Sequence, residues 1–159
     1  MNELISPDPN QISSYQVDQF QRLITRLFQC CQERMQYQSD RFDLPDAELR
    51  CLLLFGDERY LTPKGIAQKL NVVKSRVTKI INGLIKKNLI QKIKDPEDSR
   101  VTLLSITADG RQKTDDINLF LSGIHYQVLS NIHPENRTDL LRNLEVLKAS
   151  LESVKELMA

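Results

Sequence analysis

Residues 89–107 read LIQKIKDPEDSRVTLLSIT, and this stretch decides the fold. Its two ends, residues 89–94 and 101–107, are rich in β-branched residues and partly alternate between apolar and polar positions, which predicts two strands. The middle, residues 95–100, holds the proline and aspartates that favour a tight turn. The stretch therefore predicts a β-hairpin with an acidic tip that closes on one arginine, Arg100.

Two helices joined by a tight turn are predicted directly before this hairpin. Thr62 is a suitable N-cap, and Pro63 suits the first helical position, where the N–H that proline lacks would have no helical partner. Residues 71–72 make the connection, and residues 73–88 repeat apolar side chains at helical spacing. Asn88 is the predicted end, because asparagine tolerates the left-handed conformation. Two such helices followed by a hairpin make a winged helix-turn-helix.

Further helices are predicted on both sides of this unit. Residues 14–38 repeat apolar side chains every three or four positions, and a second helix is expected from about Pro45 to Gly56. After the hairpin, Thr107 is a plausible cap for a long helix, and Pro134 opens the last one. The last helix carries leucines and a valine at alternating spacings of four and three, which is a heptad seam.

The apolar seams of the first and last helices predict a homodimer. An intramolecular packing stripe is the alternative, but a 159-residue chain offers the long first helix few partners. The expected dimer contacts are Val17, Phe20, Ile24, Leu140, Leu144, Leu147, Leu151 and Val154.

The fold class predicted is mainly α with a small β-wing. We expect three parts: residues 1–40 as an N-terminal arm and long helix of the dimerisation region, residues 41–106 as the winged helix-turn-helix, and residues 107–159 as C-terminal dimerisation helices.

Composition excludes several classes of function. The chain is 40% hydrophobic and 27% charged, and no apolar run approaches the roughly 18 residues that a membrane span needs. The N-terminus lacks the features of a secretory signal, so we expect a cytoplasmic protein without membrane contact. The two histidines, His125 and His133, lack a cluster of metal ligands, and no phosphate loop or nucleophile motif is present. We expect no catalysis, no metal and no cofactor.

The charge is divided unevenly along the chain. Residues 61–100 hold eight lysines, two arginines and three acids, a net +7, whereas the other residues hold 12 basic and 18 acidic side chains, a net −6. A basic middle between acidic ends favours a polyanion as the partner of the middle.

The segment 61–111 resembles the DNA-binding core of the MarR family, bacterial winged helix-turn-helix regulators. The pattern of an aspartate two positions before an arginine, followed by a strand, is its most specific part. Asn88 stands where that family usually has glycine. The matching residues are Leu61-Thr62, Ile66-Ala67, Leu70, Val77-Thr78, Leu84, Lys86-Lys87-Asn88-Leu89-Ile90, Asp95-Pro96-Glu97-Asp98-Ser99-Arg100 and Ile106-Thr107-Ala108-Asp109-Gly110.

The helix of residues 73–88 carries side chains that suit a major groove opposite its apolar stripe. Arg76 can read guanine and Asn82 can read adenine, while lysines are better suited to phosphates. Arg100 is placed to enter a minor groove, and the resemblance implies that Asp98 holds it by a charge-assisted hydrogen bond. The expected DNA-binding residues are Thr62, Lys74, Ser75, Arg76, Thr78, Lys79, Asn82, Lys86, Lys92, Asp98 and Arg100.

The resemblance implies a homodimer that binds a pseudo-palindromic site in double-stranded DNA, as a ligand-responsive repressor. It also implies a small effector, aromatic or phenolic, that enters a cleft between the dimer helices and the winged domain. Candidate lining residues are Tyr15, Tyr37, Arg41 and Cys51, with ordinary packing as the alternative for each. Two other readings stay open: a thiol-based redox sensor that uses Cys30 or Cys31, and a helical interaction module with weak DNA binding.

Overall fold

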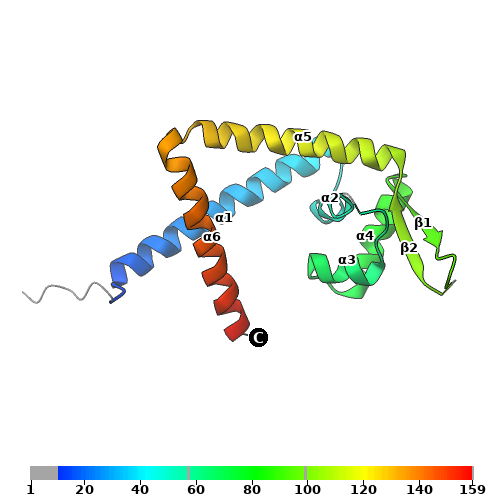
Figure 1. Ribbon diagram of the computed structural model, residues 1–159, viewed down its shortest axis with the longest axis horizontal. Coiled ribbons are helices and arrows are strands. Elements are labelled where there is room, and N and C mark those ends of the chain that lie inside the picture. The colour runs from blue at the N-terminus through cyan, green and yellow to red at the C-terminus, as the bar shows by residue number, and fades with distance from the viewer. Residues whose placement is uncertain (1–10, 57, 99, 159) are drawn as a thin grey trace, which may run out of the picture. The chain divides into compact units, whose positions relative to one another are not determined.

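The computed structural model describes residues 11–56, 58–98 and 100–158 (Figure 1). Residues 1–10 of the predicted N-terminal arm, and Ser99 in the predicted turn, lie outside the described residues. The fold is mainly helical with a two-stranded wing, so the predicted fold class is confirmed. The elements are α1 (Ser14–Phe42), α2 (Asp46–Leu53), α3 (Pro63–Leu70), α4 (Lys74–Lys86), β1 (Ile90–Lys94), β2 (Thr102–Ile106), α5 (Ala108–Ser130) and α6 (Pro134–Leu157).

The chain divides into two compact units, and the division falls after Gly110. The first unit holds α1 to β2 and the start of α5, and the second holds the rest of α5 and α6. The three-part organisation expected from the sequence remains a prediction.

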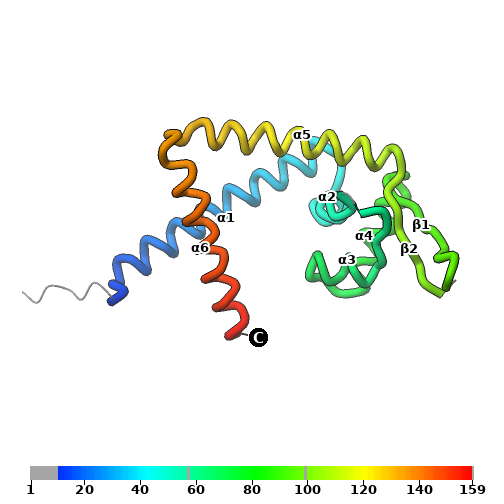
Figure 2. The backbone as a smooth tube through the Cα atoms, in the orientation of Figure 1, coloured from blue at the N-terminus to red at the C-terminus, as the bar shows by residue number. Residues whose placement is uncertain are grey.

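Helix α1 is a single long helix, which Figure 2 traces without a break. Its start is a capping box, in which the Ser13 side chain accepts from the N–H of Gln16 and the Gln16 side chain accepts from the N–H of Ser13. It continues four residues beyond the predicted end, Gln38, to Phe42. No proline or glycine interrupts it there, and the left-handed Asp43 (φ 51°) ends it.

The core of the first unit lies among α2, α3 and α4. Helix α2 follows Pro45, as predicted, and buries Leu49 and Leu52. Leu53, the last residue of α2, is half-buried. Phe55, in the following turn, is completely buried.

The wing is an antiparallel hairpin with continuous register from Ile90 opposite Ile106 to Lys94 opposite Thr102. Leu61, before α3, adds a one-residue bridge to Leu104 with hydrogen bonds of 2.9 and 2.8 Å in the two directions. Leu104 is fully buried. The wing is therefore fixed to the helix-turn-helix by backbone hydrogen bonds as well as by chain connection.

The end of α4 is joined to the start of α5 by a cluster of short hydrogen bonds. Asn88 has the left-handed backbone predicted for it (φ 58°), and its side-chain amide donates to Asp109 over 2.8 Å. The Thr107 hydroxyl donates to the Asn88 carbonyl over 2.6 Å and accepts from the N–H of Gly110, so Thr107 is the expected cap of α5. A Cβ at Gly110 would lie 2.0 Å from the Leu89 carbonyl oxygen, so only glycine fits.

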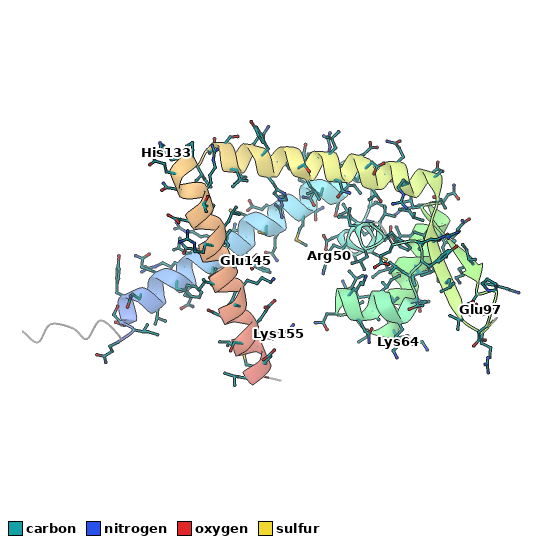
Figure 3. All side chains as sticks on the ribbon, viewed as in Figure 1. Arg50, Lys64, Glu97, His133, Glu145 and Lys155 are labelled. Atoms are coloured by element: carbon teal, nitrogen blue, oxygen red, sulfur yellow. The ribbon has the colours of Figure 1, made fainter. Side chains whose placement is uncertain are left out.

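In the second unit, α6 leaves the end of α5 at a corner near His133, which Figure 3 labels. The Nε of Arg137 donates to the carbonyls of Leu129 and Ile132, each over 3.0 Å. These bonds satisfy carbonyls at the C-terminal end of α5, which lack helical partners. Helix α6 has no buried residue among those that the structure describes.

Candidate nucleic-acid interface

Helix α4 has one buried face and one fully exposed face. Val77, Ile80, Ile81 and Leu84 are buried against the core of the first unit. The opposite face is exposed, as the helical period requires. All seven predicted α4 side chains are exposed there: Lys74, Ser75, Arg76, Thr78, Lys79, Asn82 and Lys86.

The starts of α3 and α4 differ in how they are capped. The Thr62 hydroxyl accepts from the Gly65 N–H over 3.0 Å, so this predicted DNA-binding residue is occupied as the N-cap of α3 and is half-buried. Helix α4 follows Val73, which offers no side-chain cap. The N–H groups of Lys74 and Ser75, the first of α4, can therefore donate hydrogen bonds to an external acceptor, such as a phosphate oxygen.

A small pocket of about 300 Å³ lies between α3 and α4. Its lining is mainly apolar and is made by Pro63, Lys64, Ala67, Lys74, Val77 and Thr78. Figure 3 labels Lys64 on α3, where its side chain is exposed. The pocket places two lysines beside the exposed face of α4.

The wing tip holds Arg100 through Asp98. One Asp98 oxygen accepts from the Arg100 backbone N–H over 3.0 Å and from its Nε over 3.1 Å, and the second accepts from Nη2 over 3.4 Å. The guanidinium beside Asp98 holds the pKa of that carboxyl below its ordinary value, and the backbone N–H adds to the effect. The Arg100 side chain is still 89% exposed. The arginine is oriented by the acid while its guanidinium stays open to solvent.

Lys92 and the acidic turn are two further predicted parts of the wing. Lys92 on β1 is exposed. Asp95 accepts from the N–H of Glu97 over 2.8 Å, which closes the turn locally. Glu97, labelled in Figure 3, lies at the tip of the hairpin and is exposed.

The predicted dimer residues are largely uncovered within the protomer. Val17 and Phe20 on α1 are about half exposed, as are Leu144, Leu151 and Val154 on α6. Ile24, Leu140 and Leu147 are partly covered. Other large apolar side chains, outside the predicted dimer set, are also exposed. They are Leu23, Phe28, Leu119, Tyr126, Leu141 and Val146.

The four predicted effector residues are not brought together in one protomer. Tyr15 and Tyr37 both lie exposed on α1, 22 residues apart, which corresponds to roughly 33 Å along a helix. Tyr37 and Arg41 lie one turn apart on α1, and Cys51 is completely buried in the core. A depression of about 770 Å³ in the first unit has a different lining: Gln32, Met35, Gln36, Ser39, Asp40, Asp43, Leu44, Pro45 and Asp46.

The three cysteines differ in their exposure to solvent. Cys30 and Cys31 are exposed on α1 and remain the candidates for the thiol-sensing alternative. Burial raises the pKa of the Cys51 thiol to about 12, and the charge of Glu48 adds to the rise. The thiol is thus neutral and shielded in the folded protein. Its contribution to stability is complete below the ordinary pKa of 9.0 and is lost as the pH rises through about 12.

We expect Cys51 to be inert until the protein unfolds. In a variant with Cys30→Ser and Cys31→Ser, Ellman's reagent at pH 8 should modify no thiol of the native protein and one thiol after denaturation, because only the thiolate reacts. The matched control, Cys51→Ser alone, keeps both exposed thiols. Rapid native modification of Cys51 would contradict the burial described here.

Comparison with known proteins adds to this geometry. The model of the MarR family matches residues 42–101, from the end of α1 to the wing. The chain belongs to the MarR family. It is a winged helix-turn-helix transcriptional regulator of that family, and since the family is not one of enzymes, the expectation of no catalysis is confirmed. The family model covers the two helices and the wing tip that carried the resemblance in the sequence.

Individual relatives agree with the assignment to the MarR family. The chain is 25% identical over 108 residues to the uncharacterised HTH-type transcriptional regulator YdgJ of Bacillus subtilis, which covers 68% of this chain and 65% of YdgJ. The YusO structure from Bacillus subtilis is 27% identical, with a TM-score of 0.63 over 93% of this chain and 99% of that one. Streptococcus pneumoniae FabT, solved in complex with DNA, is 20% identical, with a TM-score of 0.76 over 85% of this chain and 99% of FabT, which shows a shared fold.

The described residues contain neither a membrane-spanning helix nor a cluster of metal ligands. No helix within residues 11–56, 58–98 and 100–158 is long and apolar enough to cross a membrane. In the same part of the chain, no group of three or more His, Cys, Asp or Glu side chains is arranged to hold a metal ion.

Proposed function

We propose that this MarR-family chain binds a pseudo-palindromic site in double-stranded DNA as a homodimer and regulates transcription through that binding. One observation carries the proposal: the exposed, donor-rich face of α4 and the oriented Arg100 of the wing belong to the same compact unit. The net +7 of residues 61–100 supports a polyanionic partner for this unit.

The residues divide naturally between reading bases and positioning the protein. With α4 in a major groove, Arg76 can donate two hydrogen bonds to a guanine, and Asn82 can pair with an adenine. Arg100 would enter the neighbouring minor groove, where a narrow A·T-rich segment attracts arginine. The remaining exposed basic residues would contact phosphates: Lys74, Lys79, Lys86 and Lys92.

Relatives support DNA as the partner. FabT, whose structure was solved in complex with DNA, has the same fold at 20% identity. YdgJ carries the name of an HTH-type transcriptional regulator. Neither relative supplies a DNA sequence for this chain, so the site has to be found by experiment.

A homodimer accounts for the uncovered apolar side chains of α1 and α6. Exposed leucines, valines and phenylalanines at helical spacing are costly in a monomer, and burial against a second copy removes them from water. Members of the MarR family form dimers, and a two-fold protein matches a two-fold DNA site.

Repression in response to a small effector is the regulatory mode that we propose. An aromatic or phenolic effector would shift the population of DNA-competent dimers if it bound one arrangement better than the other. Tyr37 and Arg41 on α1 are the predicted effector residues that remain neighbours within one protomer. We expect the cytoplasm as the location, which is typical of the family.

Selection from a random duplex library tests the proposed function. The full-length protein should enrich a pseudo-palindrome with equal half-sites about one helical turn apart. Enrichment of no common sequence would contradict the proposal. The variant Arg76→Ala should still bind DNA but should select a site with relaxed preference at one position of each half-site.

A further inference from the structure

A carboxylate from α2 lies in a notch on helix α4. Glu48, the third residue of α2, lies 39 positions before Lys87 in the sequence. Its Oε2 accepts from the Nζ of Lys87, at the C-terminal cap of α4, over 2.6 Å. The Glu48 side chain is only 13% exposed, and that of Lys87 is 35% exposed.

Gly83 creates the space for this carboxylate. A Cβ at Gly83 would lie 2.0 Å from Oε1 and 2.8 Å from Cδ of Glu48, so the carboxylate occupies the place where any other residue would have a side chain. Glycine in the middle of a helix costs stability relative to alanine. Gly83 and Lys87 are four residues apart, which places them on one face of α4. Gly83 and Lys87 therefore both border the Glu48 carboxylate.

Lys87 therefore differs from the other lysines around α4. Lys74, Lys79 and Lys86 are exposed, as is Lys87, but none of these three has an ion pair among the described residues. The ammonium of Lys87 is bound to the carboxylate of Glu48 on α2. Charge alone would count Lys87 as a phosphate contact, and its contact with Glu48 argues otherwise.

We propose that Glu48, Gly83 and Lys87 form a positioning notch for the recognition helix. The ion pair fixes the axial position and rotation of α4 on α2, and thereby the placement of Arg76 and Asn82 against base edges. This inference rests on the proposed DNA-binding function and adds residues that would act through α4 without touching DNA. A part-buried ion pair contributes more to defining one arrangement than to net stability, because desolvation offsets most of its attraction.

The lysine pair Lys86 and Lys87 offers a matched test. Fluorescence anisotropy measures the affinity of each full-length variant for the selected operator and for a scrambled duplex, across a salt series. Lys87→Met should weaken operator binding about tenfold while scrambled-DNA binding and the salt slope stay unchanged, since base-reading groups need precise support. Lys86→Met should weaken both duplexes alike and reduce the slope by about 0.9 per protomer. Lys87→Arg keeps the donor and should stay near wild type.

Gly83→Ala separates positioning from stability. Alanine favours the helix, so this variant should melt at the wild-type temperature or above it. Its methyl group expels the Glu48 carboxylate, so operator affinity should still fall about tenfold, as in Glu48→Gln. If the pair were only structural, operator affinity would instead follow the melting temperature across the four notch variants Gly83→Ala, Glu48→Gln, Lys87→Met and Lys87→Arg.

The outcomes separate this inference from the proposed function. If wild-type protein prefers the operator while Gly83→Ala, Glu48→Gln and Lys87→Met keep the operator-to-scrambled ratio within twofold, the notch does not position α4. A reduced salt slope in Lys87→Met would show Lys87 to be a phosphate contact, which also overturns the inference. If the wild type has no preference between the duplexes, the proposed function itself fails.

Discussion

Replacing both Leu144 and Leu151 by glutamate should turn the protein into a monomer and reduce operator affinity by roughly 10²- to 10⁴-fold, because linked half-sites lose their second, effectively intramolecular contact. The two leucines lie seven residues apart on one face of α6 and are 47% and 50% exposed within the protomer. Two buried carboxylates in the seam would have no partner, and the cost of desolvating them opposes association. Analytical ultracentrifugation gives the oligomeric state, and anisotropy gives the affinity.

The control for this variant places the same charges on the other side of the helix. Ala149→Glu with Ser153→Glu adds two glutamates at exposed positions that face away from Leu144 and Leu151. This control should remain dimeric and bind the operator normally. A dimer that persists with glutamate at both leucine positions would show that α6 does not form the interface through this seam.

The second large effect is expected at the wing. Arg100→Ala should weaken operator binding by roughly 10- to 100-fold, the range typical of one well-made base contact. Asp98→Ala should weaken it less, because Arg100 keeps its charge and loses only the carboxylate that orients it. Anisotropy on the selected duplex measures both. Unchanged affinity in both variants would falsify the assignment of a groove contact to the wing.

A Glu97 variant and the pH dependence of binding provide two controls for the wing experiment. Glu97→Ala removes an exposed acid from the same turn, so it should leave affinity equal or raise it. The pKa of Asp98 is lowered by Arg100, so the pair is intact above the ordinary carboxyl pKa and is lost only as the pH falls through the lowered value. Around neutral pH, protonation of Asp98 should therefore have no effect on binding.

The elements that the sequence predicted well are those set by local chemistry. Thr62 and Pro63 begin α3, Asn88 takes the left-handed backbone, and residues 95–98 and 100 lie in the connection between the paired strands. In each case a residue type with a narrow conformational preference stands at the position that needs it. The exposed face of α4 followed from the same helical period.

Features that depend on distant contacts were not predictable in this way. The notch pairs Glu48 with Gly83 and Lys87, and no local pattern marks a glycine as space for a remote carboxylate. Thr62 was expected at DNA and is occupied as a cap. Helix length separates Tyr15 from Tyr37 within one protomer, and the effector set remains a prediction.

We propose that the basic middle of this MarR-family protein reads a specific DNA site. The most direct measurement is the affinity of the full-length dimer for its selected pseudo-palindrome and for a scrambled duplex of equal length, across a salt series. We expect a preference of at least about 10³-fold for the selected duplex, with a steep salt slope on both. Equal affinity for the two duplexes at every salt concentration would contradict the account.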